Sequence, residues 1–263
     1  MQDLKKITLE VIELSKSVGA FIHREAGRIG SDNIEEKGLH DLVTYVDREA
    51  EKRLVAALGK IVPEAGFIAE ENQELQKRDK FNWIIDPLDG TTNFIHGIPK
   101  YCVSVALAEK KEIISAVVFE INQDECFYAW KDSPAYLNGK EIKVSPTTIL
   151  EKSLIATGFP YSDYSLLTPY LGLLEELMKE TRGIRRLGSA ALDLAYVACG
   201  RFELFFEYGL KPWDVAAGAL IVERAGGIVT DFSDGKNYIF GKQIVASNPH
   251  IQTDFFKKLE RYF

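Results

Sequence analysis

The segment from Asp86 to Thr92, DPLDGTT, concentrates the residue types best suited to chemistry in this sequence. The apolar run WII before it predicts a buried strand that ends at two carboxylates, Asp86 and Asp89. The proline between them fixes φ, and Gly90 allows a close approach of the backbone. Thr91 or Thr92 can cap a following helix, and the amide groups of Gly90 and Thr91 would then form a cradle for an anion. This strand end could therefore bind a cation and a phosphate together, and a turn whose acids only cap the chain is the alternative.

Further acids stand at predicted strand ends or helix starts: Asp47, Glu70, Glu71, Glu207 and Asp214. If Glu70, Asp86, Asp89 and Asp214 converge, their mutual repulsion would force protonation unless cations bind them. A set of oxygen ligands without His or Cys selects hard ions, and Mg²⁺ is the natural occupant when a phosphate completes its octahedron. Two such ions can hold both the attacking and the leaving oxygen of a phosphate displacement.

Each of these acids also has a simpler interpretation when it is taken alone. Asp47 and Asp214 can be caps at helix N-termini. Glu207 ends the alternating segment FELFFE and can be a solvated strand end. The metal hypothesis therefore depends on the convergence of the acids in space.

The elements that must position these acids follow from hydrophobic periodicity. Residues 4–21 and 47–59 show helical spacing, and the polar stretch 27–41 between them is expected to be a loop. Residues 66–72 and 83–94 each contain a strand that stops at acids, and 101–144 predicts an antiparallel sheet with a type I′ hairpin at Asn138-Gly139. From residue 154 onward strands and helices alternate.

This organisation predicts an α+β protein with two lobes in one continuous body, residues 1–150 and 151–263. The first lobe would carry most of the metal ligands, and the second would complete the metal and substrate site between the lobes. No linker of low complexity and no internal repeat separates the two. The length of 263 residues suits one large domain or two tightly joined ones.

The composition excludes several classes of protein. There are 32 Lys and Arg against 39 Asp and Glu, a net charge of −7, which argues against a protein whose main affinity comes from neutralising nucleic-acid phosphates and leaves a local basic patch open. No apolar run approaches the length of a membrane span, and the amphipathic, charged start does not resemble a signal peptide, so a cytoplasmic protein is expected. Cys102, Cys126 and Cys199 lie in apolar contexts without metal-ligand spacing, which predicts neither a disulfide nor a zinc site.

At the level of whole motifs, the sequence resembles the inositol monophosphatase family, within the lithium-sensitive, magnesium-dependent phosphatase superfamily. The resemblance rests on four segments in the family's order and spacing: GLHDLVTYVD (38–47), IAEEN (68–72), WIIDPLDGTTNF (83–94) and PWDVAAGALIVERAGG (212–227). Residues 188–207 look most like the bacterial inositol-1-monophosphatase branch. The resemblance implies a layered αβαβα sandwich of the inositol monophosphatase and fructose-1,6-bisphosphatase type, and a homodimer.

The resemblance also implies the metal ligands and the catalytic groups. One Mg²⁺ would be held by Glu70, Asp86 and the carbonyl group of Leu88, a second by Asp86, Asp89 and Asp214, and a third, weaker one near Glu70 through water. Asp47 and Thr91 match the pair that orients and deprotonates the attacking water. The amide groups of Gly90 and Thr91 would bind the phosphate.

For the substrate's hydroxyl groups the resemblance points to five residues: Asp89, Ser189, Ala190, Glu207 and Asp214. Ser189 stands where the family often has threonine, and its contact is expected partly through the backbone. Lys37 matches a loop lysine that approaches the metals in relatives. Arg201 is a further candidate for the binding of a second phosphate, and the pair Arg185-Arg186 could attract an anionic substrate, lie at a dimer interface or be solvated.

The function implied is hydrolysis of a small phosphate monoester, myo-inositol 1-phosphate above all, by in-line attack of metal-activated water without a phosphoenzyme. Within this class, a dual inositol monophosphatase/fructose-1,6-bisphosphatase and a phosphatase of NADP or 3′-phosphoadenosine nucleotides stay open, since the metal ligands are common to all. Lithium inhibition is a further expectation from the resemblance. A regulatory protein that works through partners is the alternative of another class; the complete set of acids argues for retained catalysis.

Overall fold

The fold is described from a computed structural model for residues 3–28, 34–38, 41–72, 74–160 and 163–263, with the backbone alone at 34–38 and 41–42. Two helices, α1 (Leu4–Glu25) and α2 (Tyr45–Ile61), form the first layer. The α1 helix begins after Asp3, whose side chain accepts a hydrogen bond of 3.1 Å from the amide of Lys6. Its buried positions follow the predicted helical spacing and continue beyond residue 21 to Ile22, so the helix is longer than predicted.

A seven-stranded sheet forms the second layer and carries the first group of acids. Its strands, in spatial order, are β3 (Gly66–Ala69), β4 (Phe81–Asp89), β5 (Cys102–Glu109), β6 (Glu112–Glu120), β7 (Glu125–Trp130), β8 (Ala135–Leu137) and β9 (Lys140–Ile142). The β3 strand is parallel to β4, and all the other pairs are antiparallel. Asn138 and Gly139 join β8 to β9 with φ of 48° and 81°, which confirms the predicted hairpin.

A five-stranded sheet lies in the second half of the chain. Its strands run in the order β11 (Gly183–Arg185), β10 (Leu154–Thr157), β12 (Leu204–Tyr208), β14 (Gln243–Ser247) and β13 (Ile228–Thr230), and a short 3₁₀ helix, η2 (Leu150–Lys152), precedes β10. The first three strands are parallel to one another, and β14 is antiparallel to both of its neighbours. Two helices, α4 (Leu167–Glu180) and α7 (Gln252–Leu259), cover its outer face through Tyr170, Leu173, Leu177, Phe255 and Leu259.

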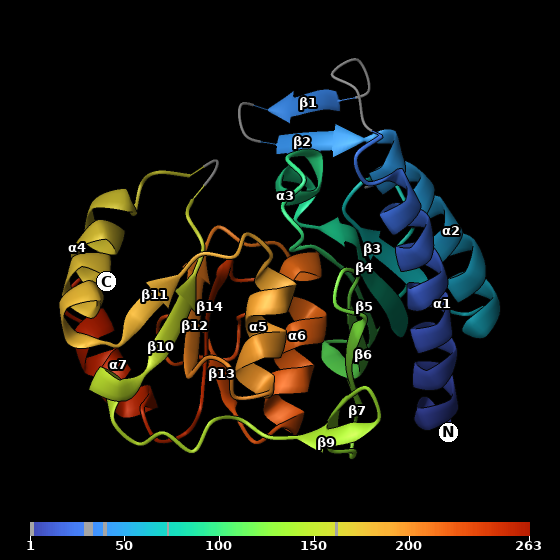
Figure 1. Cartoon of the computed structure of the whole chain (residues 1–263). Coiled ribbons are helices and arrows are strands. Elements are labelled where there is room, and N and C mark those ends of the chain that lie inside the picture. The colour runs from blue at the N-terminus through green and yellow to red at the C-terminus, as the bar shows by residue number, and fades with distance from the viewer. Residues whose placement is uncertain (1–2, 29–33, 39–40, 73, 161–162) are drawn as a thin grey trace.

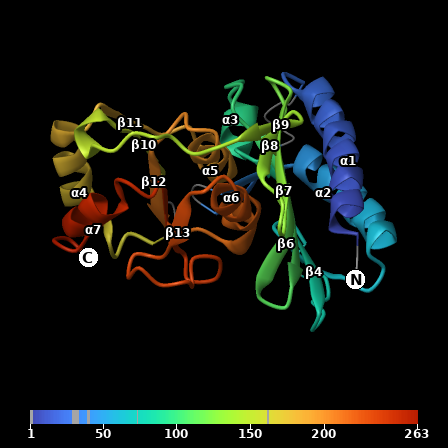
Figure 2. The same cartoon turned by 90° about the horizontal axis from the view of Figure 1, so that it is seen from below.

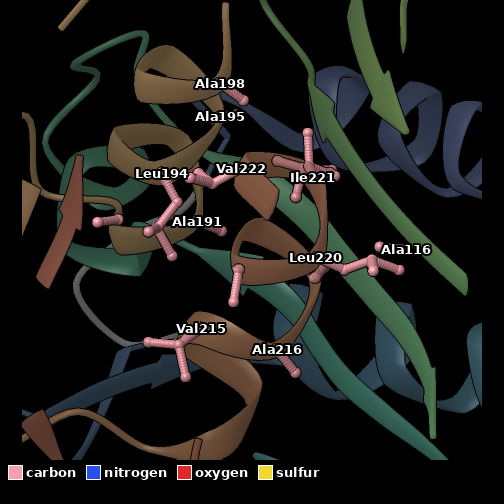
Figure 3. Close-up of a cluster of buried hydrophobic side chains, with 14 of the residues drawn as sticks. Ala116, Ala191, Leu194, Ala195, Ala198, Val215, Ala216, Leu220, Ile221 and Val222 are labelled. Carbon is pink, nitrogen blue, oxygen red and sulfur yellow. The ribbon is translucent and has the colours of Figure 1, made fainter. Parts of the chain in front are cut away.

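The α5 (Ala190–Ala198) and α6 (Pro212–Arg224) helices fill the space between the two sheets. Figure 3 shows how short side chains of α5 meet branched side chains of α6. A Cβ atom on Gly218 would lie 2.5 Å from Cβ of Leu194, so glycine is required for this close approach. The order of layers in Figures 1 and 2 is therefore helices, sheet, helices, sheet, helices, which confirms the predicted αβαβα sandwich of the α+β class.

The two sheets comprise residues 66–142 and 154–247, so the predicted boundary at residue 150 falls between them. The division into two lobes stays a prediction, because α5 and α6 pack against strands of both sheets within one hydrophobic cluster. Among the described helices, none combines the length and the apolar character needed to cross a membrane.

The predicted loop at 27–41 contains one strand and the first residue of the next, so that prediction is wrong for part of the segment. The β1 strand (Ile34–Gly38) pairs antiparallel with β2 (Asp41–Thr44), and Figure 1 shows the pair beside the short helix α3 (Thr91–Ile95). The sequence of β1 has no apolar alternation, the signal by which a half-buried strand is recognised. Hydrophobic patterning therefore does not detect this strand.

Candidate active site

An irregularity in β4 turns two carboxylates towards one another. In the pairing of β4 with β5, Asp86 is opposite Ser104 and Asp89 is opposite Cys102, so β4 has one residue more than its partner. Residues three apart on a regular strand point to opposite faces, and the extra residue of a bulge removes that opposition. Proline at position 87 suits the bulge because it has no amide hydrogen to offer the ladder. The amide of Leu88 donates a hydrogen bond of 3.0 Å to Oδ1 of Asp86, which fixes the turn.

Gly90 lets the chain pass from β4 directly into α3. Its φ of 104° and ψ of 32° are in the left-handed region, where it caps the helix. A Cβ atom here would lie 2.9 Å from the carbonyl oxygen of Lys100, so a larger residue is excluded on two grounds. The first amide groups of a helix have no acceptor within the helix, and those of α3 therefore face outward beside Asp89.

Asp47 and Thr91 form a hydrogen-bonded pair from separate elements. Thr44 caps α2, and Oδ2 of Asp47 accepts hydrogen bonds from the Thr44 amide at 2.8 Å and the Thr44 hydroxyl at 2.6 Å. The other carboxylate oxygen, Oδ1, is 2.8 Å from the hydroxyl of Thr91 in the first turn of α3. That hydroxyl is also 3.0 Å from the carbonyl oxygen of Leu88. Burial raises the pKa of Asp47, and these hydrogen bonds lower it.

Asp89 joins the end of β4 to the N-terminus of α5. Its Oδ2 accepts hydrogen bonds of 2.7 Å from the hydroxyl of Ser189 and 2.7 Å from the amide of Ala191. Sequence comparison assigned Ser189 and Ala190 to the substrate; here the Ser189 hydroxyl also holds a carboxylate of the site. Burial raises the pKa of Asp89 to about 6, although these donors and the charge of Arg186 lower it.

Asp214 is both a helix cap and a member of the acidic cluster. It stands in the first turn of α6, and its Oδ2 accepts a hydrogen bond of 2.6 Å from the amide of Lys211. Burial, followed by the charge of Asp89, raises the pKa of Asp214 to about 7. The interpretation as a cap is confirmed, and the position of Asp214 near Asp89 is compatible with the predicted site.

The structure brings Glu70 close to Asp86. Glu70 follows β3, which is parallel to β4, and the last residue of β3, Ala69, pairs with Ile85, the residue before Asp86. Burial raises the pKa of Asp86 well above its ordinary value, and the charges of Glu70, Asp89 and Asp214 add to this rise. The charges of Glu70, Asp89 and Asp214 therefore act on Asp86, while the charge of Arg186 lowers the pKa of Asp89 and that of Lys211 lowers the pKa of Asp214.

These four groups fit a hard cation by their chemistry, since each offers carboxylate oxygens and their repulsion would be relieved by positive charge. As the side chains stand in the described parts of the chain, no group of three or more His, Cys, Asp or Glu is arranged to hold a metal ion. The side chains of Asp86 and Glu70 instead hydrogen-bond to each other, as two carboxyl groups do when they share a proton.

Glu207 and a second acid, Asp193, lie on the side of the cluster towards the five-stranded sheet. Glu207 is 5% exposed, and burial and the charge of Asp214 raise its pKa well above the ordinary value. Asp193 is 1% exposed, and burial and the charges of Glu207 and Asp89 raise its pKa too. Sequence reasoning missed Asp193; its signal was one acid inside the otherwise apolar helix AALDLAYVA.

One nearby cation is Arg186, whose charge lowers the pKa values of Asp89, Asp193 and Glu207. The structure does not bring Arg201 to the cluster of carboxyl groups. Arg201 follows the C-terminal end of α5, roughly 14 Å along the helix from Ser189, and its guanidinium group binds both carboxylate oxygens of Glu125. The backbone of Lys37 belongs to β1, and its side chain lies outside the described residues.

The sequence and the fold of this chain are similar to those of known proteins of one family. The model of the inositol monophosphatase family matches residues 3–262. The protein named Nus factor SuhB of Pseudomonas aeruginosa is 42% identical over 264 residues, which cover 98% of this chain and 95% of that protein. The crystal structure of extragenic suppressor protein suhB from Bartonella henselae has a TM-score of 0.92 and 39% identity, and covers 98% of this chain and 100% of that chain. An IMPase of Thermotoga maritima has a TM-score of 0.87 and 38% identity, with 96% of each chain covered.

Proposed function

Because the chain belongs to the inositol monophosphatase family, we propose that it is a Mg²⁺-dependent phosphatase that hydrolyses myo-inositol 1-phosphate to myo-inositol and phosphate. The observation that carries this proposal is the convergence of Glu70, Asp86, Asp89 and Asp214 beside the hydrogen-bonded pair of Asp47 and Thr91. Buried carboxyl groups that repel one another are costly for the fold, and a site that binds cations accounts for them.

In this proposal the residues divide between two main metal positions. Glu70, Asp86 and the carbonyl group of Leu88 hold one Mg²⁺, Asp86, Asp89 and Asp214 hold a second, and a third, weaker ion lies near Glu70. When bound, Mg²⁺ supplies positive charge that stabilises the transferring phosphoryl group and lowers the pKa of water.

The proposed role of Asp47 and Thr91 is to orient a water molecule and take its proton. The Thr91 hydroxyl donates to Asp47, so the lone pairs of its oxygen are free to accept a hydrogen bond from water. As the water oxygen forms its bond to phosphorus, the water proton passes to Oγ1 of Thr91 and the Thr91 proton passes to Asp47. The bond from phosphorus to the inositol oxygen breaks and leaves its electron pair on that oxygen, which takes a proton from a second water molecule. Phosphate and inositol leave, and Asp47 returns its proton to the solvent.

Substrate binding is assigned to the elements around the carboxylates. The amide groups of Gly90 and Thr91 bind phosphate oxygens at the start of α3. The hydroxyl groups of the ring contact Ser189, Ala190 and Glu207, together with the oxygens of Asp89 and Asp214 that face the substrate. We also propose that the protein is a homodimer and is inhibited by lithium, as the family resemblance implies, and that it is cytoplasmic, as expected from the sequence pattern.

A panel of phosphate esters tests the substrate assignment. Phosphate release would be measured on inositol 1-phosphate, fructose 1,6-bisphosphate, NADP and 3′-phosphoadenosine 5′-phosphate. Selective turnover of inositol 1-phosphate supports the assignment. Comparable turnover of fructose 1,6-bisphosphate would make the protein a dual phosphatase, and preferred turnover of a nucleotide would replace the assignment.

The names of two similar proteins favour a second candidate function, binding to a partner protein. The relative from Pseudomonas aeruginosa is called a Nus factor, and the one from Bartonella henselae an extragenic suppressor protein. We propose that this chain has a partner-binding role of the Nus-factor kind in addition to catalysis. A pull-down from native extract with the Asp86→Asn protein tests it, and the absence of a stoichiometric partner would count against this role.

A further inference from the structure

A cavity of about 530 Å³ lies at the end of α6 far from the acidic cluster. Asp214 stands in the first turn of α6, and the cavity lining on this helix begins at Ala219, roughly 7.5 Å further along the helix axis. The lining comes from the β5–β6 and β7–β8 turns of the large sheet, from α6, and from residues 236–239 between β13 and β14. The volume is in the range of small-molecule sites, and the walls come from both halves of the chain.

The floor of the cavity is apolar. Ile113, Leu220 and Ile239 line it, each 6–9% exposed, together with Ala219. The ring of Tyr238 forms a further wall, and its hydroxyl donates a hydrogen bond of 2.7 Å to Glu223. A flat hydrocarbon group could therefore be buried here without leaving the tyrosine hydroxyl unsatisfied.

Some of the positive charge at the rim of the cavity is not paired with negative charge within the described residues. Lys131 is paired with Glu112 at 3.0 Å, so these two charges compensate one another. Lys111 and Lys236 are exposed and make no ion pair or hydrogen bond within the described residues. Lys111 belongs to the β5–β6 turn and Lys236 to the segment before β14, and both line this one cavity.

We propose that this cavity binds an organic anion, with an aromatic or otherwise flat apolar body over Leu220 and Ile239 and a sulfonate, carboxylate or phosphate group between Lys111 and Lys236. Apolar burial gives such a ligand affinity, and the two ammonium groups give it selectivity for negative charge. Glu223 and Asp132, which also line the cavity, disfavour ligands that carry further negative charge near them. The proposal is independent of the phosphatase reaction.

Titration of the whole protein with 8-anilinonaphthalene-1-sulfonate, which fluoresces in apolar sites, tests the proposal. One saturable site per chain is expected. Lys111→Gln and Lys236→Gln should each weaken its binding by about fivefold, the effect of one exposed charge pair. Binding of the uncharged analogue N-phenyl-1-naphthylamine should not change, and Lys140→Gln, an exposed lysine of β9 away from the cavity, is the matched control.

A variant with the opposite expected sign makes the test stricter. Glu223→Gln removes a negative charge from the lining of the cavity and should strengthen binding of the sulfonate about twofold. Because the exchanged side chains are exposed, all variants should keep the melting temperature of the wild type. The proposal is overturned if both lysine variants bind the sulfonate as the wild type does, or if they lose the sulfonate and the uncharged analogue equally.

Discussion

The hydroxyl of Thr91 donates a hydrogen bond of 2.8 Å to Oδ1 of Asp47, although 44 residues separate the two. Asp47 cannot turn away from this contact, because its other oxygen accepts two hydrogen bonds from Thr44 at the N-terminus of α2. Helix α2 is thereby joined to the turn that follows β4. A cap that stabilises one helix also orients a side chain beside the carboxylate cluster.

Thr91→Val should lower kcat by about 10²- to 10⁴-fold, the usual contribution of a positioned acid–base group, with a much smaller change in KM. The valine keeps the shape of threonine, so the fold should persist. Thr92→Val is the matched control, because Thr92 is exposed and next in sequence. Steady-state kinetics on inositol 1-phosphate provides the measurement, and equal activity of both variants would remove Thr91 from the mechanism.

Asp86→Asn should stabilise the metal-free protein. Asp86 is 2% exposed, and its charge is opposed by burial and by Glu70, Asp89 and Asp214. The asparagine oxygen can still accept the hydrogen bond that the Leu88 amide gives to Asp86. We expect a higher melting temperature without metal and the loss of any rise on addition of Mg²⁺. The exposed Asp79→Asn is the control, and a melting temperature of Asp86→Asn below that of the wild type would contradict the prediction.

Stability without metal should fall as the pH rises from about 4 to about 7. Burial raises the pKa of Asp89 to about 6 and that of Asp214 to about 7, from ordinary values of 3.8. Both groups are protonated in the folded and unfolded states below their ordinary pKa. Above it the unfolded chain ionises first, so the stability is lost as the pH rises through the pKa values of the folded state.

Magnesium should reverse this loss, since it compensates the ionised carboxylates. The rise in melting temperature caused by Mg²⁺ should therefore be a few degrees larger at about pH 8 than at about pH 5. Thermal unfolding in EDTA and in Mg²⁺ at both pH values gives this difference. An equal rise at the two pH values would show that these carboxylates do not bind the ion.

Gly218→Ala should destabilise the protein by about 1–3 kcal/mol, because the added Cβ would lie 2.5 Å from Cβ of Leu194 in the contact between α5 and α6. Gly59→Ala in α2 is the control. Its Cβ would meet Phe67 at 3.9 Å, and alanine favours a helix over glycine by about 1 kcal/mol. Denaturant unfolding measures both variants. A neutral Gly218→Ala would mean that the two helices can separate without cost.

The carboxylates of the site could be predicted from sequence because they end apolar runs or begin helices. Glu70 follows β3 and Asp86 lies in β4, two strands that hydrophobic patterning identifies, and the parallel pairing of these strands then places the two acids together. Arg186, Asp193 and Arg201 could not be placed in this way. Arg186 precedes α5, Asp193 lies within it and Arg201 follows it. Whether each lies near the cluster therefore depends on how α5 packs against the five-stranded sheet. These are tertiary relationships that local spacing does not contain.

The central claim, that the carboxylate cluster is the site of a Mg²⁺-dependent phosphatase, is tested most directly by phosphate release from inositol 1-phosphate. The wild type and Asp86→Asn would be compared in Mg²⁺ and in EDTA. We predict release by the wild type in Mg²⁺ and none above background in the other three cases. Turnover by Asp86→Asn near the wild-type rate, or turnover by the wild type in EDTA, would contradict the claim.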